Sequence, residues 1–128
     1  MNNYEWLDQY LLGKPGVVKD FKAEWQWWRY MVGGKMFAAT MHPSEKYAPE
    51  YAEKDLLSLK CEPMMAELLR KTYPEILPGF YTDKANWNSI CLDGEVPEEL
   101  MREMCDNSYN LIFAKLTKKA QREILGEQ

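Results

Sequence analysis

Residues 25–41, WQWWRYMVGGKMFAATM, decide the fold of this chain. Two runs rich in aromatic and other apolar side chains flank a pair of glycines, which is typical of two β-strands joined by a tight turn. Gly33 and Gly34 permit the positive φ angles of a two-residue turn, so we expect Val32 to face Lys35. The stretch therefore predicts an antiparallel β-hairpin.

This register also predicts which side chains share a face, because side chains alternate across a strand. One predicted face holds Trp28, Tyr30, Phe37, Ala39 and Met41. The opposite face holds Trp25, Trp27, Arg29, Met31, Met36, Ala38 and Thr40. The second set combines large aromatic rings with a cation, so it is the first candidate for a binding surface.

Upstream of the hairpin, Asn3 can cap a short amphipathic helix that ends at the Gly-Lys-Pro-Gly run of residues 13–16. A strand is expected from Val17 to Phe21. Residues 42–54 contain two prolines and show no persistent apolar period, so we expect a loop there.

Downstream of that loop, an alternating run predicts a strand over 55–61, with Leu57, Leu59 and Cys61 on one side. A helix bearing Met65, Leu68 and Leu69 should begin at Pro63 and end at Pro74. Further β segments are expected at 80–81 and 87–92. The longest helix should begin at Pro97, with an apolar face formed by Met101, Met104, Cys105, Ser108, Ile112 and Leu116. These elements predict a single α+β domain over residues 1–128, with helices packed on an antiparallel sheet.

The composition is that of a soluble globular protein: 128 residues, 46% hydrophobic, 28% charged, with a net charge of -4. Because the charge is negative, no global positive field attracts nucleic acid or anionic lipid. We find no membrane span or signal peptide in the sequence and expect a cytoplasmic protein. Three cysteines without a CxxC pair predict reduced, mostly buried thiols at Cys61, Cys91 and Cys105, without zinc.

Charge is unevenly distributed along the chain. Residues 93–106 contain six acidic residues, and four basic residues follow, namely Lys115, Lys118, Lys119 and Arg122. Acids in the first turn of a helix and bases in its last turn complement the helix dipole, which explains both groups. The alternative is that the basic tail contacts phosphates.

Several short segments in fixed order resemble the MmcQ/YjbR family of small bacterial domains. These segments are residues 32–38 (VGGKMFA), 59–63 (LKCEP), 87–89 (WNS), 92–97 (LDGEVP) and 108–109 (SY). The resemblance implies a fold similar to that of bacterial frataxins, and DNA binding through paired hairpins that look like two wings. The family tends to place histidines before the Trp-Asn motif, where this chain reads GFYTDKAN over residues 79–86, so no imidazole function is expected there.

Catalysis is not expected, because the single histidine, His42, lies in a loop with no motif around it. The carboxylate pairs of the acidic block are typical of a solvated helix face. Activated cysteines are not indicated either. We therefore expect a non-enzymatic protein without a cofactor or a metal.

The resemblance and the residues together suggest a duplex DNA-binding surface on which aromatic rings stack and cations meet phosphates. Its candidate residues are Trp27, Arg29, Lys35, Lys60, Lys84, Lys118 and Lys119. A helix or a partner subunit covering the aromatic face is the competing interpretation. The alternative function is a protein-interaction or small-ligand-binding module, which would use the Trp25/Trp27 face, as in a homodimer, or a pocket under the 42–54 loop. Ser108 and Tyr109 are expected to form a buried hydroxyl network.

Overall fold

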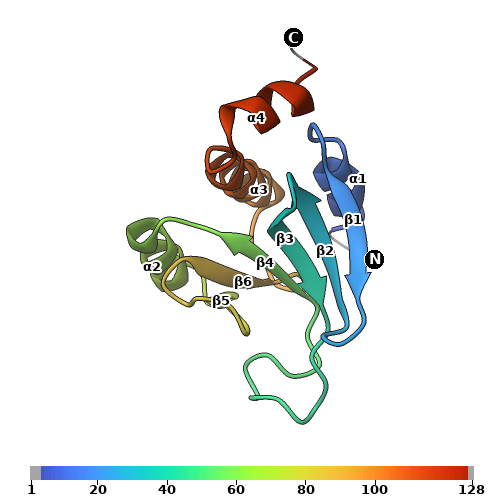
Figure 1. Ribbon diagram of the computed structural model, residues 1–128. Helices are drawn as coiled ribbons and strands as arrows, with labels where there is room; N and C mark the ends of the chain where they lie inside the picture. The colour runs from blue at the N-terminus through green and yellow to red at the C-terminus, as the bar shows by residue number, and fades with distance from the viewer. Residues whose placement is uncertain (1–3, 127–128) are drawn as a thin grey trace.

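The hairpin around Gly33 and Gly34 forms the second and third strands of a six-stranded sheet in the computed structural model, which describes residues 4–126 (Figure 1). Asn3, the expected helix cap, lies outside the described residues. The elements, in chain order, are α1 (Leu7–Leu12), β1 (Val18–Lys22), β2 (Trp27–Val32), β3 (Lys35–Met41), β4 (Leu56–Lys60), α2 (Pro63–Thr72), β5 (Ile76–Pro78), β6 (Trp87–Cys91), α3 (Glu98–Phe113) and α4 (Lys118–Ile124). The strand order is β1-β2-β3-β4-β6-β5 and every neighbouring pair is antiparallel. The α+β prediction is confirmed.

The turn of the hairpin is as expected, but its register is not. Gly33 and Gly34 have φ angles of 56° and 79°, and Val32 pairs with Lys35. Beyond Met31 and Met36 the register shifts, so that Tyr30 pairs with Ala38 and Phe37 has no partner in β2. An extra residue of this kind is a β-bulge, and it reverses the facing of every later side chain in the strand.

The bulge corrects the predicted faces of the hairpin. Ala39 and Met41 belong to the apolar cluster that contains Trp27, whereas we expected them beside Tyr30. Ala38 instead joins Tyr30 and Phe37 in the main core. Thr40 also lies on the other face than predicted, because it pairs with Trp28.

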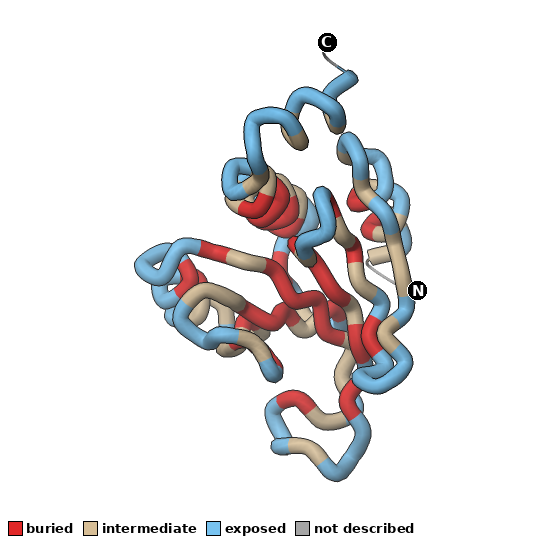
Figure 2. The backbone as a smooth tube through the Cα atoms, in the orientation of Figure 1, coloured by how far each residue is buried: buried red, intermediate tan, exposed pale blue. Residues whose placement is uncertain are grey.

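The first three helices cover one face of the sheet and enclose the main core. Leu7 and Leu11 of α1, Ala66 and Leu69 of α2, and the inward side of α3 all belong to one cluster of buried residues. Figure 2 shows the buried backbone concentrated in the central strands and in α3. The strand over 55–61 directs Leu57, Leu59 and Cys61 into this core, as predicted.

The other face of the sheet is covered by chain without regular secondary structure. A second cluster on that face joins Trp27, Ala39 and Met41 to Tyr51 of the 42–54 loop and to Phe80, which follows β5. The loop prediction is confirmed. The aromatic face is therefore covered in part by this loop rather than by a helix, while Trp25 stays 51% exposed, and a partner subunit on that face remains a prediction.

Three helix and strand predictions need correction. In α2 the buried residues are Ala66 and Leu69, while Met65 and Leu68 are exposed. Residues 80–81 are not a strand, and the edge strand β5 precedes them. The longest helix, α3, ends at Phe113, before Leu116, and a separate helix, α4, follows it.

Helix α3 is held to its neighbours by two hydroxyl groups, which confirms the predicted buried network. The Ser108 hydroxyl donates to the carbonyl of Phe37 and accepts from the Lys60 backbone N–H at 2.9 Å. The Tyr109 hydroxyl donates to the Pro15 carbonyl at 2.6 Å. Because Phe37 is the bulged residue, Ser108 supplies a partner at the point where the strand ladder is interrupted.

The three thiols are free, as expected, with Cys61 and Cys105 buried and Cys91 half-buried. Burial raises the pKa of Cys105 to about 12 and also raises the pKa of Cys61 and of Cys91. None of these thiols is therefore an activated thiolate near neutral pH. Among residues 4–126, no helix is long and apolar enough to span a membrane.

Candidate functional site

The seven residues suggested for nucleic-acid binding do not form one surface, because three of them are engaged by other groups near the covered face. Trp27 is buried in the second cluster. Arg29 donates twice to the Asp20 carboxylate, at 2.8 and 2.6 Å. Lys84 donates to the Gly79 carbonyl at 2.8 Å. The nucleic-acid role of these three residues remains a prediction.

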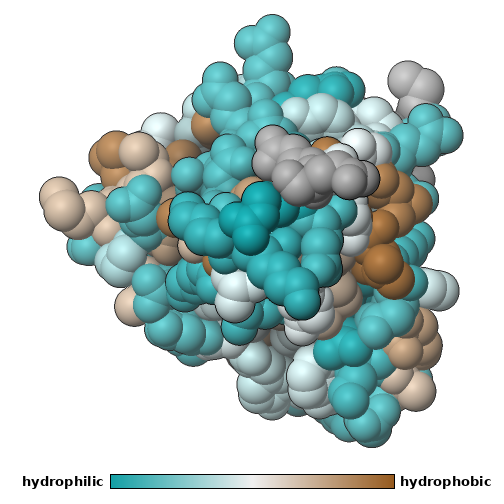
Figure 3. Space-filling view, turned by 45° about the horizontal axis from the view of Figure 1, so that its top comes forward, coloured by the Kyte–Doolittle hydropathy of each residue, from teal (hydrophilic) through white to brown (hydrophobic). Residues whose placement is uncertain are grey.

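The other four suggested residues lie at the opposite end of the hairpin. We call this region the basic end and define it as Lys35, Lys60, Lys115, Lys118 and Lys119. The hairpin turn meets the α3–α4 connection there, because a Cβ at Gly33 would lie 2.6 Å from a methyl group of Leu116. Figure 3 views the molecule with this end turned forward and shows hydrophilic side chains gathered over α4.

The centre of the basic end is a close approach of two cations, Lys60 at the end of β4 and Lys115 just after α3. The pKa of Lys60 is lowered, first by burial and then by the neighbouring Lys115 ammonium, while Asp83 opposes the shift. Asp83 is itself engaged, because its carboxylate accepts from the Ala85 backbone N–H and the Asn86 amide. The Lys115 ammonium therefore acts on Lys60 more strongly than Asp83 does, and the Lys60 ammonium also lies over the Trp87 ring, 5.8 Å from its centre.

No lysine of the basic end forms an ion pair with a described acidic residue. The helix dipole does not explain these cations either. Helix α3 has no basic residue in its last turn, and Lys118 and Lys119 lie in the first turn of α4, where the dipole disfavours positive charge. The dipole explanation therefore fails for Lys118 and Lys119, because α3 ends earlier than expected, whereas it holds for Arg122 in the last turn of α4 and for Glu98 and Glu99 in the first turn of α3.

Lys115 was not among the seven suggested residues. In the sequence, only its place in the basic tail indicates that it could belong to a binding site. Its interaction with Lys60 depends on a strand that ends 55 positions earlier in the chain. Such long-range pairs cannot be read from local spacing.

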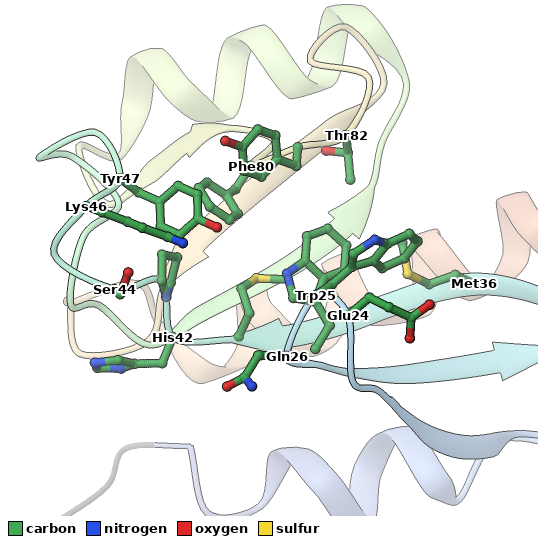
Figure 4. Close-up of a pocket in the computed structure, with 14 residues that line it drawn as sticks. Glu24, Trp25, Gln26, Met36, His42, Ser44, Lys46, Tyr47, Phe80 and Thr82 are labelled. Carbon is green, nitrogen blue, oxygen red and sulfur yellow. The ribbon is translucent and has the colours of Figure 1, made fainter.

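A second candidate lies on the covered face, where a cavity of about 730 Å³ opens beside the 42–54 loop. We call it the aromatic cleft. Its lining includes Trp25, Trp27 and Met36 of the hairpin region, Tyr47 of the loop, and Phe80. Figure 4 shows Trp25 and Met36 facing Tyr47 and Phe80 across this space. The pocket suggested under the 42–54 loop is therefore present.

Three contacts close the base of the 42–54 loop and so shape the cleft. The Glu53 backbone N–H donates to the Pro43 carbonyl at 2.7 Å. The Tyr51 hydroxyl donates to the Pro78 carbonyl at 2.7 Å. His42 Nδ1 lies 2.8 Å from a carboxylate oxygen of Asp55, one residue beyond the other end of the loop.

His42 is tied into a small acidic network. The Asp55 carboxylate raises the pKa of His42, and Glu53, 3.6 Å from Nε2, contributes in the same direction. Asp55 also accepts a hydrogen bond from the Tyr4 hydroxyl, which raises the pKa of that tyrosine to about 12. No cluster of three or more metal-ligating side chains occurs among the residues that the structure describes.

Comparisons with known proteins agree on one family. The YjbR family model matches residues 12–111. The chain is 30% identical over 103 residues to the uncharacterised protein YjbR of Escherichia coli, covering 80% of each chain. It is 38% identical over 61 residues to the uncharacterised protein YyaQ of Bacillus subtilis, covering 48% of this chain and 51% of that one.

Solved structures share the fold. The crystal structure of Deinococcus radiodurans protein DR2400, a DUF419 domain, has a TM-score of 0.78 and 31% identity, covering 100% of this chain and 91% of that one. A Pseudomonas syringae protein of 24% identity has a TM-score of 0.69, covering 87% of this chain and 98% of its own, and it supports the fold alone.

Proposed function

The chain belongs to the YjbR family, and we propose that this member is a non-enzymatic protein that binds duplex DNA through its phosphates at the basic end. The resemblance to a double-wing DNA-binding family motivates the choice of partner. The family match ends at residue 111, before three of the five lysines, so the proposal concerns this member rather than the family.

The observation that supports the proposal is a group of five lysines that form no ion pair with a described acidic residue, in which the Lys115 ammonium lowers the pKa of Lys60. Two like charges held together in a folded protein cost free energy unless something compensates them. A phosphate placed between the two ammonium groups would supply that compensation, since each lysine is a point charge that donates to phosphate oxygens. Lys35, Lys118 and Lys119 extend the positive surface on either side.

The mode of binding follows from the side chains available. Lysine contacts to phosphates set position and carry little sequence information, so binding should be weakly selective for sequence. The net charge of -4 opposes binding at long range, so the affinity should be low and should fall steeply with salt as counterions are released.

The non-enzymatic part of the proposal rests on how the reactive side chains are engaged. The single histidine is held by two carboxylates, and the thiol of Cys105 has a pKa near 12 because of burial. The tyrosine hydroxyls that donate to carboxylates have raised pKa values, about 12 for Tyr4 and for Tyr10, so they stay protonated near neutral pH.

Fluorescence anisotropy of a labelled duplex of about 20 base pairs, titrated between about 50 and 200 mM salt, tests the proposal. Lys60→Gln/Lys115→Gln should weaken binding and flatten the plot of log affinity against log salt by roughly 0.9 for each lost phosphate contact. Lys71→Gln, a lysine exposed on α2, removes the same type of charge elsewhere and should leave the slope unchanged within about half a contact.

A wild type that does not bind at low salt would overturn the proposal. So would a double variant with the wild-type slope. The circular dichroism of the double variant should match the wild type, because Lys60 and Lys115 form no ion pair with a described acidic residue, and that of Lys71→Gln should match because its ion pair with Glu67 is exposed.

A further inference from the structure

The aromatic cleft has features that DNA binding at the basic end does not use. We propose that it is a binding site for a small planar aromatic molecule that carries one negative charge, such as an aromatic carboxylate. The shape of the cleft, its exposed rings, its backbone conformation and its charge support this assignment.

The cleft has the size and the walls of a ligand site. Its volume of about 730 Å³ falls within the range of roughly 300–1,000 Å³ typical of small-molecule pockets. Trp25 and Trp27 contact each other edge to face with ring centroids 5.2 Å apart, and Tyr47 and Phe80 do the same at 5.2 Å. A flat ring placed between these two pairs would meet aromatic surface on both sides.

Large aromatic side chains remain exposed at the rim. Trp25 is 51% exposed and Tyr81 is 72% exposed, although both line the cleft. A protein that needed these rings only for its core would bury them, so exposed rings around a concave space mark a place where something else supplies the contact.

Backbone strain is concentrated around the same space. Among the described residues, the only non-glycine positions with positive φ are Gln26, Glu53 and Tyr81. Gln26 and Tyr81 line the cleft, and Glu53 lies at the end of the loop that forms it. Such conformations cost free energy, especially for a bulky residue such as Tyr81, and they cluster at sites that hold ligands.

The charge within the cleft selects an anion. Lys46 lines it and has no described acidic partner, its ammonium lying 5.4 Å from the centre of the Tyr47 ring. Of the other charged lining groups, Glu24 pairs with Lys22 at 3.2 Å and His42 is held by Asp55. One free cation beside aromatic walls matches a ring with a single negative group.

The wall also holds a spare hydrogen-bonding group. Thr82 lines the cleft, and its hydroxyl oxygen is the one buried side-chain polar atom in residues 4–126 without a hydrogen-bond partner. It packs against Gly79, where an added Cβ would lie 2.0 Å from it. Rotation of this small side chain would direct the hydroxyl to a bound ligand.

Titration with 2-naphthoate and with the uncharged 2-naphthamide, followed by calorimetry and by NMR of the five tryptophan indole N–H signals, tests the proposal. The naphthoate should bind more tightly than the amide and should shift the signals of Trp25 and Trp27, but not that of Trp28 on the opposite face. Trp25→Ala should weaken naphthoate binding by roughly tenfold, because it removes one stacking surface.

Two matched variants separate the site from general stickiness. Trp28 is 46% exposed, so Trp28→Ala removes a similar ring elsewhere and should leave binding unchanged. Lys46→Gln should abolish the preference for naphthoate over naphthamide, whereas Lys71→Gln should retain it. Absence of binding, equal weakening by Trp25→Ala and Trp28→Ala, or an unchanged preference in Lys46→Gln would each overturn the proposal.

Discussion

At the level of single residues, the protonation of His42 depends on its neighbours. It lies against the carboxylates of Asp55 and Glu53, which raise its pKa. A raised pKa means that the charged pair stabilises the folded loop below about pH 6.5, and that this contribution is lost as the pH rises through the folded pKa. The pKa of the Asp55 carboxyl shifts in the other direction, because the hydrogen bond from the Tyr4 hydroxyl lowers it.

We therefore expect an NMR titration of His42 to give a pKa above 6.5. Because it is the single histidine, its ring signals need no assignment by mutation. Asp55→Asn should return the pKa toward 6.5, with Glu53 retaining part of the shift. A wild-type value at or below 6.5 would show that the pair does not form in solution.

Ser108 is the second residue with a measurable role, because its hydroxyl serves two backbone groups of different strands. Ser108→Ala leaves the Lys60 N–H and the Phe37 carbonyl without that partner, and both are enclosed by α3. Urea denaturation should show a loss of about 1–3 kcal/mol in the free energy of unfolding. Ser44→Ala, in the exposed part of the 42–54 loop, is the control and should change it by less than about 0.5 kcal/mol.

At the scale of elements, turns and strands were more predictable than the faces they present. Gly33 and Gly34 specify a two-residue turn through their backbone freedom, so the hairpin follows from local chemistry. The bulge at Phe37 has no local signal, because its compensating contact comes from Ser108 on a helix 71 positions later in the chain. The predicted faces were wrong from that point onward for this reason.

The buried face of helix α2 also depends on its packing partners rather than on its own sequence. Its apolar residues cover more than one face, and packing on β5 and β6 selects Leu69, 8% exposed, over Leu68, 56% exposed. Leu69→Ala should cost about 2–5 kcal/mol of unfolding free energy because it leaves a cavity, while Leu68→Ala should cost less than about 1 kcal/mol. If urea denaturation shows equal losses of unfolding free energy for the two substitutions, Leu69 is not the residue of this pair that faces the core.

At the level of the whole molecule, the basic end lies around the hairpin turn and the α3–α4 connection, whereas the aromatic cleft lies along the face of the hairpin beside the 42–54 loop. The aromatic cleft was foreseeable in outline, because a proline-containing loop beside an aromatic strand predicts a covered pocket. The basic end was foreseeable only as a list of lysines, since the contact between Lys60 and Lys115 depends on where α3 ends and where β4 meets it. Arg29 and Lys84 are cations of the same kind in sequence, yet the fold directs them to Asp20 and Gly79.

The central claim, that duplex DNA binds at the basic end, is tested most directly by mapping backbone amide shifts in NMR spectra of the wild type at low salt. Addition of a duplex of about 20 base pairs should perturb Lys35, Lys60 and residues 115–119 together, and the perturbation should disappear as the salt concentration rises. Shifts centred instead on Arg29 and the 42–54 loop, or no shifts at all, would contradict it.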